Sequence, residues 1–128
     1  MRINWSSNTQ IEKAFDSSGA VQVGHVVEVS GTNAMEDGRV VGLNDVTLQT
    51  EYIIKKIEHI LLEAGFGLSD VVRTRIFMTD ISQWEEVAKV HSYLFEDTSP
   101  ASTVVEISRL IHPDLLIEIE ATAVKEAS

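Results

Sequence analysis

Residues 44–78 read NDVTLQTEYIIKKIEHILLEAGFGLSDVVRTRIFM and contain two patterns in succession. Asn44 and Asp45 supply an N-cap, and apolar side chains then recur every three or four residues as far as Ala64. This spacing predicts an amphipathic helix, and the glycines that follow predict its end. The stretch from Val71 to Met78 is rich in Val, Ile, Phe and Thr, which predicts a strand. A domain that combines helices and a sheet follows from these residues.

The segments on either side of residues 44–78 contain further predicted strands and a second helix. On the N-terminal side, aliphatic residues on both sides of Gly24 and His25 predict two strands joined by a tight hairpin. We expect residues 1–15 to be irregular and residues 35–42 to form a loop. On the C-terminal side, a capping-box match at residues 82–85 predicts a helix to about residue 95. Strands are expected over 102–107 and 116–124. Strand alternation predicts that Arg73 and Arg75 share a face with Val71 and Phe77.

The expected element order is β-β-α-β-α-β-β, which defines an α+β sandwich of one sheet with two helices. We expect one domain over residues 1–128. Two helices can cover only one face of such a sheet, and nothing else in the chain can cover the other. Assembly of several copies through that open sheet face is therefore a hypothesis from topology alone.

Composition excludes several classes of protein. The 128 residues contain no cysteine, so disulfide scaffolds, thiolate metal sites and cysteine nucleophiles are ruled out. The four histidines show no ligand spacing, and we expect neither a metal nor a membrane span. The start lacks the apolar segment of a signal peptide, so a soluble cytoplasmic protein is expected. The formal net charge of −10, with scattered basic residues, makes nucleic acid an unlikely partner.

Two sets of polar residues allow more than one interpretation. His91 falls on the apolar stripe of the second helix, where it is either a buried, hydrogen-bonded side chain or a group at the rim of a pocket. Glu118 and Glu120 share one face of the last strand, ~6–7 Å apart. They either act as paired carboxylates in acid–base catalysis or form ion pairs with Arg73 and Arg75. Charge pairing is the interpretation that the pattern alone favours.

Four segments together resemble the Rid family of reactive intermediate deaminases, also called the YjgF or L-PSP family and often labelled endoribonuclease. They are VSGT at 29–32, SDVVRTRIFMTD at 69–80, PASTVVE at 100–106 and LIEIEA at 116–121. The resemblance implies a chorismate-mutase-like fold and a homotrimer with clefts between its subunits. It also implies hydrolysis of enamines and imines, such as 2-aminoacrylate, without a cofactor.

The resemblance assigns roles to individual residues. The family's water-activating glutamate corresponds to Glu118, and its cleft serine and glycine correspond to Ser30 and Gly31. The hydroxyl next to the family's carboxylate-binding arginine corresponds to Thr103. The arginine itself is replaced by Ser102, the family's cleft tyrosine by Ser17, and its helical asparagine by Ala88. His91, on the same helix as Ala88, is a candidate for what the pocket uses instead.

Three functions follow as alternatives. The first is a Rid-type hydrolase of enamines, imines or related small metabolites, whose substrate differs from 2-aminoacrylate because serine cannot replace a bidentate guanidinium. The second is a non-catalytic or regulatory trimer that binds a small metabolite in the same clefts. The third, endoribonuclease or translation inhibitor, is disfavoured by the acidic charge.

Overall fold

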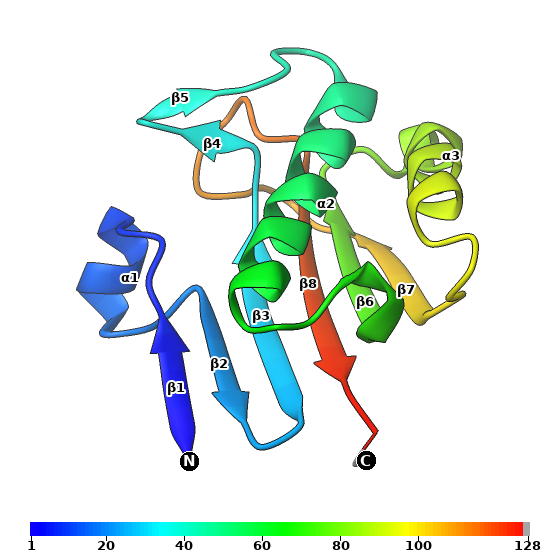
Figure 1. Cartoon of the computed structure of the whole chain (residues 1–128). Helices are drawn as coiled ribbons and strands as arrows, with labels where there is room; N and C mark the ends of the chain where they lie inside the picture. Colours follow the sequence, from blue (N-terminus) through cyan, green and yellow to red (C-terminus); the bar gives the residue numbers. More distant parts are fainter. Residues whose placement is uncertain (127–128) are drawn as a thin grey trace.

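The computed structural model describes residues 1–126 and is built around one six-stranded sheet (Figure 1). Its strands are β1 (Arg2–Trp5), β2 (Ala20–Val23), β3 (Val26–Thr32), β6 (Val71–Met78), β7 (Ala101–Glu106) and β8 (Ile117–Val124). The spatial order is β1-β2-β3-β8-β6-β7, so the last strand lies inside the sheet. β6 and β7 pair in parallel, as a helical crossover between them requires.

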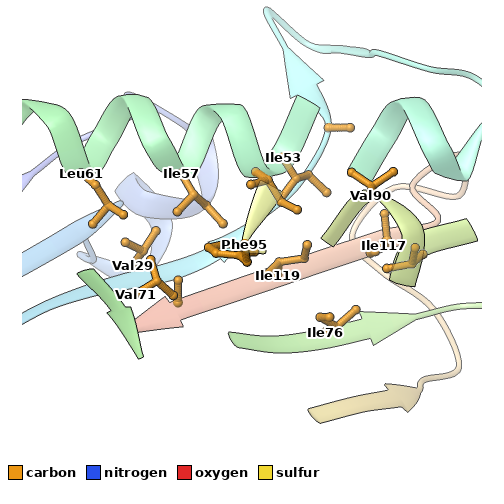
Figure 2. Packing of buried hydrophobic residues seen from close by; sticks show 14 of the residues in the cluster. Val29, Ile53, Ile57, Leu61, Val71, Ile76, Val90, Phe95, Ile117 and Ile119 are labelled. Carbon is orange, nitrogen blue, oxygen red and sulfur yellow. The ribbon is translucent and has the colours of Figure 1, made fainter. Parts of the chain in front are cut away.

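Two helices pack on one face of this sheet, as predicted. α2 (Val46–Glu63) begins where the Asp45 side chain accepts a hydrogen bond from the Leu48 backbone N–H at 3.0 Å. It ends before Gly65, whose φ of 81° needs a residue without a side chain. The apolar stripe of α2 packs over β3, β6 and β8, and α3 (Trp84–Leu94) extends the same core beside it (Figure 2). The stick residues of Figure 2 include Val29, Ile53, Ile57, Leu61, Val71, Val90 and Ile119.

The opposite face of the sheet is open in the single chain. β8 shows this clearly, because Ile117, Ile119, Ala121 and Ala123 are buried while the residues between them are only partly buried. The predicted α+β fold of one sheet with two helices on one face is therefore confirmed, and the sheet is mixed. β7 forms one edge of the sheet, and all six of its residues are exposed. No helix within residues 1–126 is long and apolar enough to cross a membrane.

The prediction of an irregular segment over residues 1–15 is wrong. Residues Arg2–Trp5 form β1, which pairs with β2, and residues Gln10–Phe15 form the short helix α1. α1 is capped by Thr9, and the buried Glu12 carboxylate accepts hydrogen bonds from Ser6 and Ser7. These elements are too short to show a period, and they depend on contacts with other segments. The expected loop over 35–42 likewise contains a small hairpin of β4 (Met35–Glu36) and β5 (Arg39–Val40).

Two local predictions also need correction. The register of β6 against β8 shifts between Val71 and Arg73, so Val71 faces the helices while Arg73 and Arg75 lie on the open face. Alternation alone could not show this irregularity. The capping box at residues 82–85 does not form, because a 3₁₀ turn over Ile81–Gln83 precedes α3 and is capped by the Asp80 side chain.

Candidate functional site

The Glu118 carboxyl lies against the backbone of β3. The β3–β8 register shifts between Val29 and Thr32, and Gly31 lies within this irregularity. A Cβ atom at Gly31 would come within 2.8 Å of the Glu118 Cδ atom, which is closer than real Cβ contacts allow. Glycine at position 31 is therefore what leaves room for the carboxyl group.

Glu118 is partly buried, and its surroundings change the pKa of its carboxyl group. Burial raises the pKa of the Glu118 carboxyl, and the charge of Glu120 raises it further. A side-chain hydrogen bond with Asn33 acts in the opposite direction. The net effect is a carboxyl whose pKa is shifted from its usual range toward neutral pH, as suits a group that both accepts and donates protons.

Ser30 precedes Gly31 on β3. The Ser30 hydroxyl donates to the Gly19 carbonyl oxygen at 2.9 Å, and the Ser30 backbone N–H donates to the same oxygen. Ser17 is exposed and lies just after α1, and no hydrogen bond within the described residues joins it to Ser30 or Glu118. We call Ser30, Gly31 and Glu118 the acidic half-site.

A second group of residues lies where β6, β7 and α3 meet. Thr74 of β6 pairs in register with Ser102 of β7, and their hydroxyl oxygens are 2.6 Å apart. The Nε2 atom of His91 lies 2.9 Å from the Thr74 Oγ1 atom and 3.4 Å from the Ser102 Oγ atom. We call Thr74, His91 and Ser102 the neutral half-site. Sequence reasoning named two of its members and missed Thr74.

His91 combines both of the roles considered for it. Its ring packs on Phe95 with the centroids 4.6 Å apart, and burial lowers the pKa of the imidazole, which is therefore neutral at pH 7. Its Nε2 atom nevertheless reaches the exposed Ser102 hydroxyl. His91 is thus a half-buried side chain that is hydrogen-bonded to the surface of β7.

Thr103 is separated from Ser102 by the alternation of β7. Its hydroxyl accepts a hydrogen bond from the Arg73 guanidinium at 2.5 Å, and Arg73 projects from the open face of the sheet. Ser102 points instead to the helix side, as its bond to the buried Thr74 shows. Two neighbouring residues with related expected roles therefore face opposite sides of one strand.

The ion pairs favoured by the sequence pattern are absent from residues 1–126. Arg75 lies opposite Glu120 in the β6–β8 register, whereas Glu118 lies opposite Phe77. The contacts at ion-pair distance in this part of the chain are His59–Glu63 and His112–Asp114, which are ion pairs only when the histidine is protonated. The preference for charge pairing over a free Glu118 carboxyl was therefore wrong. The same residues contain no cluster of three His, Asp or Glu side chains arranged to hold a metal ion.

The two half-sites do not meet within one chain. Glu118 lies on the open face of β8, and Ser102 lies on the helix side of β7, with β6 between the two strands. Two strand spacings and an offset of three residues along the strands separate their backbones by roughly 14 Å. Two concave surfaces found in the described chain, of about 520 Å³ along the outer face of α3 and about 170 Å³ beside Trp5 and Lys56, include neither Glu118 nor Ser102.

The fold and these residues define an α+β protein with an open sheet face and two separate polar half-sites. Residues 8–125 match the family model described as Endoribonuclease L-PSP. A RutC family protein of Pyrococcus abyssi is 39% identical over 85% of this chain and 86% of its own length. The 3-aminoacrylate deaminase RutC of Acinetobacter baylyi is 33% identical over 81% of this chain and 82% of its own length.

A solved structure agrees with these relatives. The crystal structure of Rv2704 from Mycobacterium tuberculosis, a YjgF family member, has a TM-score of 0.88 and 42% sequence identity, and the match covers 98% of this chain and 100% of that chain. This chain belongs to the Rid/YjgF family, the L-PSP family of the matching model. The resemblance drawn from four short segments is confirmed.

Proposed function

We propose that this protein hydrolyses small enamines and imines, without a cofactor, in clefts between the subunits of a homotrimer. The observation that carries the proposal is the Glu118 carboxyl, which is half-buried against Gly31, has a raised pKa and forms no ion pair within the described residues. Structural carboxylates pair with cations or, like the buried Glu12, accept hydrogen bonds from several donors. Asn33 is the hydrogen-bond partner found for Glu118, and the raised pKa of Glu118 supports a role in proton transfer.

The chemistry that we assign to Glu118 is the activation of water. The enamine first takes a proton on carbon and releases one from nitrogen, which converts it to the imine. The ionised carboxyl then accepts a proton from a water molecule while the water oxygen bonds to the imine carbon, and the carboxyl returns that proton to the nitrogen. The resulting carbinolamine loses ammonia as the proton of its hydroxyl group is transferred through the carboxyl to the nitrogen and the C–N bond breaks, which leaves a carbonyl compound. One water is consumed, and one ammonia is released.

The homotrimer is part of the proposal because one chain separates the two half-sites. Glu118 and Ser102 face opposite sides of the sheet, so a small substrate cannot contact both in the same subunit. The uncovered sheet face and the exposed edge strand β7 are the surfaces on which further copies would pack. In such an assembly the acidic half-site of one subunit lies beside the neutral half-site of the next.

The proposed substrate differs from 2-aminoacrylate. A guanidinium holds a carboxylate through two charge-assisted hydrogen bonds, and Ser102 has neither the charge nor the forked geometry. The reaction class is supported by similarity to the Acinetobacter baylyi RutC protein, which is named for the deamination of 3-aminoacrylate. The family label of endoribonuclease receives no support from a chain with a formal charge of −10.

The test compares Glu118→Gln with Glu120→Gln, which removes a carboxylate from the same face of the same strand. Ammonia release from 2-iminopropionate and 3-aminoacrylate is followed for both variants and for the unmodified protein. We expect Glu118→Gln to lose ~10²–10⁴-fold in kcat on whichever compound is turned over, and Glu120→Gln to lose under about tenfold. Equal losses in the two variants, or full activity of Glu118→Gln, would refute the assigned role.

The replacement at Ser102 also favours a second candidate, a non-catalytic trimer that binds a small metabolite. Ser102→Arg separates the two candidates. Activity on 2-iminopropionate that appears only in this variant indicates an intact catalytic half-site whose natural ligand is not a 2-imino acid. Thermal stabilisation by small ligands without turnover, in both the unmodified protein and Ser102→Arg, would support the binding protein instead.

A further inference from the structure

The neutral half-site consists of three hydrogen-bonding groups, of which the buried Thr74 hydroxyl is the central one. Thr74 in the middle is fully buried, His91 at one end is half-buried, and Ser102 at the other end is exposed. Each neighbour in the chain is within hydrogen-bond distance, at 2.9 Å for His91 to Thr74 and 2.6 Å for Thr74 to Ser102.

The neutral half-site carries no charge at neutral pH. Burial holds the pKa of His91 below its usual value, and the two hydroxyl groups do not ionise. The neighbouring cations on β6, Arg73 and Arg75, project from the opposite face of the sheet. A carboxylate placed on Ser102 would lose its hydration without gaining a countercharge from these groups, which is unfavourable.

The donor and acceptor roles among Thr74, His91 and Ser102 can be arranged in either of two directions. Each hydroxyl has one proton, and the neutral imidazole Nε2 atom is a donor in one tautomer and an acceptor in the other. If Nε2 donates to Thr74 and Thr74 donates to Ser102, the Ser102 proton is available to a ligand. If the order is reversed, Ser102 presents a lone pair. The Ser102 Oγ atom also lies 3.4 Å from the His91 Nε2 atom and 3.3 Å from the Pro100 carbonyl oxygen, and both are long contacts that a ligand can replace.

An arginine at this position would behave differently, because a guanidinium is always charged and only donates. A hydroxyl that switches between donor and acceptor suits a group that offers both, such as a primary carboxamide with its carbonyl oxygen and its NH₂. The acidic net charge of the whole chain adds a field that disfavours anions.

We propose that Ser102, supported by Thr74 and His91, is the subsite for an uncharged carbonyl group of the substrate, and that the protein acts on enamine or imine carboxamides in preference to the corresponding acids. This inference rests on the proposed hydrolase function and specifies its substrate class. Ser102 contacts the ligand, whereas Thr74 and His91 are positioning residues that act through Ser102.

The test uses 3-aminocrotonamide and 3-aminocrotonate, two enamines that differ only in carboxamide against carboxylate. Hydrolysis consumes one water and releases ammonia together with acetoacetamide or acetoacetate. We expect the unmodified protein to favour the amide in kcat/KM by at least about tenfold, since an unpaired carboxylate loses more than a neutral group on leaving water. A preference for the acid would overturn the proposal.

Three variants test which residues cause the preference for the amide over the acid. Ser102→Ala is expected to lower kcat/KM for the amide by about three- to tenfold, with little change for the acid. Ser102→Arg is expected to reverse the preference. Thr74→Val keeps the shape of the side chain and is expected to raise KM for the amide with kcat unchanged, because only binding is weakened. If Ser102→Ala lowers both substrates by the same factor, Ser102 does not select the carbonyl group and the proposal fails.

A separate measurement distinguishes failure of this inference from failure of the hydrolase function. If neither enamine is turned over in a Glu118-dependent way, the hydrolase function fails on these probes. Binding of acetoacetamide and acetoacetate is then measured by calorimetry. Preferential binding of the amide that is lost in Ser102→Ala supports the subsite in a non-catalytic protein. Equal binding of the two compounds, or binding that Ser102→Ala does not change, refutes it.

Discussion

The acidic and neutral half-sites differ in how they are built and in what they retain of the family pattern. The acidic half-site depends on backbone geometry, because the irregularity in β3 and the absence of a side chain at Gly31 make room for Glu118. The neutral half-site depends on side chains that bond to one another across β6, β7 and α3. The first carries the carboxyl group to which we assign the chemistry, and the second carries no charge at neutral pH. We therefore assign the reaction, which we expect to be shared with the family, to the acidic half-site and the choice of substrate to the neutral half-site.

Among variants that keep the Glu118 carboxyl, the largest effect is expected from Gly31→Ala. The added methyl group overlaps the Glu118 carboxyl, which lies at the far end of a flexible side chain and can move aside. A displacement of about 1 Å at a catalytic group costs on the order of 10² in rate. We therefore expect about a hundredfold loss of kcat with a nearly unchanged melting temperature.

Gly67→Ala is the matched control for that variant, because a Cβ atom there meets only the Ser69 Oγ atom, at 3.8 Å. It is expected to retain full activity. If Gly31→Ala is as active as Gly67→Ala, the close approach between Gly31 and Glu118 has no part in the reaction.

A smaller effect, on stability, is expected from Thr74→Val. The substitution preserves volume but leaves His91 and Ser102 without their shared partner, and a partly buried unsatisfied group costs ~1–3 kcal/mol. Urea denaturation measures the loss. Thr122→Val removes a hydroxyl on β8 that bonds to the exposed Glu28, and it is expected to cost under about 0.5 kcal/mol. A loss in Thr74→Val no larger than in Thr122→Val would show that the neutral half-site is not a coupled unit.

The smallest effect is a pH dependence of stability at the acidic half-site. Folding raises the pKa of Glu118, so the folded state binds this proton more tightly than the unfolded state. The corresponding stabilisation is present below the unfolded pKa and is lost as the pH rises through the folded value. The melting temperature of Glu118→Gln relative to the unmodified protein should therefore increase from pH 4 to pH 8. A difference that stays constant with pH, or shrinks, contradicts a raised pKa.

Much of the fold could be predicted because its main elements are long and periodic. The stripe of α2, its Asp45 cap and the alternation of β8 all follow from the repeat distances of a helix and a strand. The short β1 and α1 could not be predicted, since their stability comes from pairing with β2 and from the buried Glu12. A bulge such as the one near Val71 leaves no mark on the pattern of apolar residues.

Only part of the candidate site could be predicted, because some of its residues belong to short family motifs and others are brought together by packing. Glu118, Ser30 and Gly31 were identified through short family motifs, and the structure places them on adjoining strands. Thr74 was missed although a signal was present, because it is a polar residue on the buried face of β6 and His91 is a polar residue on the buried stripe of α3. Two such residues on facing elements indicate a buried hydrogen bond.

The sequence by itself determined the α+β class, the helix and strand periods and the family, and it made Glu118 a candidate catalytic residue. These features depend on local backbone geometry or on short runs of residues. Only the tertiary structure decided that Glu118 lies opposite Phe77 and forms no ion pair, and that Ser102 shares a hydrogen-bonded chain with Thr74 and His91. Register, bulges and the meeting of distant side chains arise from packing between segments that lie far apart in the chain. No repeat distance in the sequence encodes those contacts.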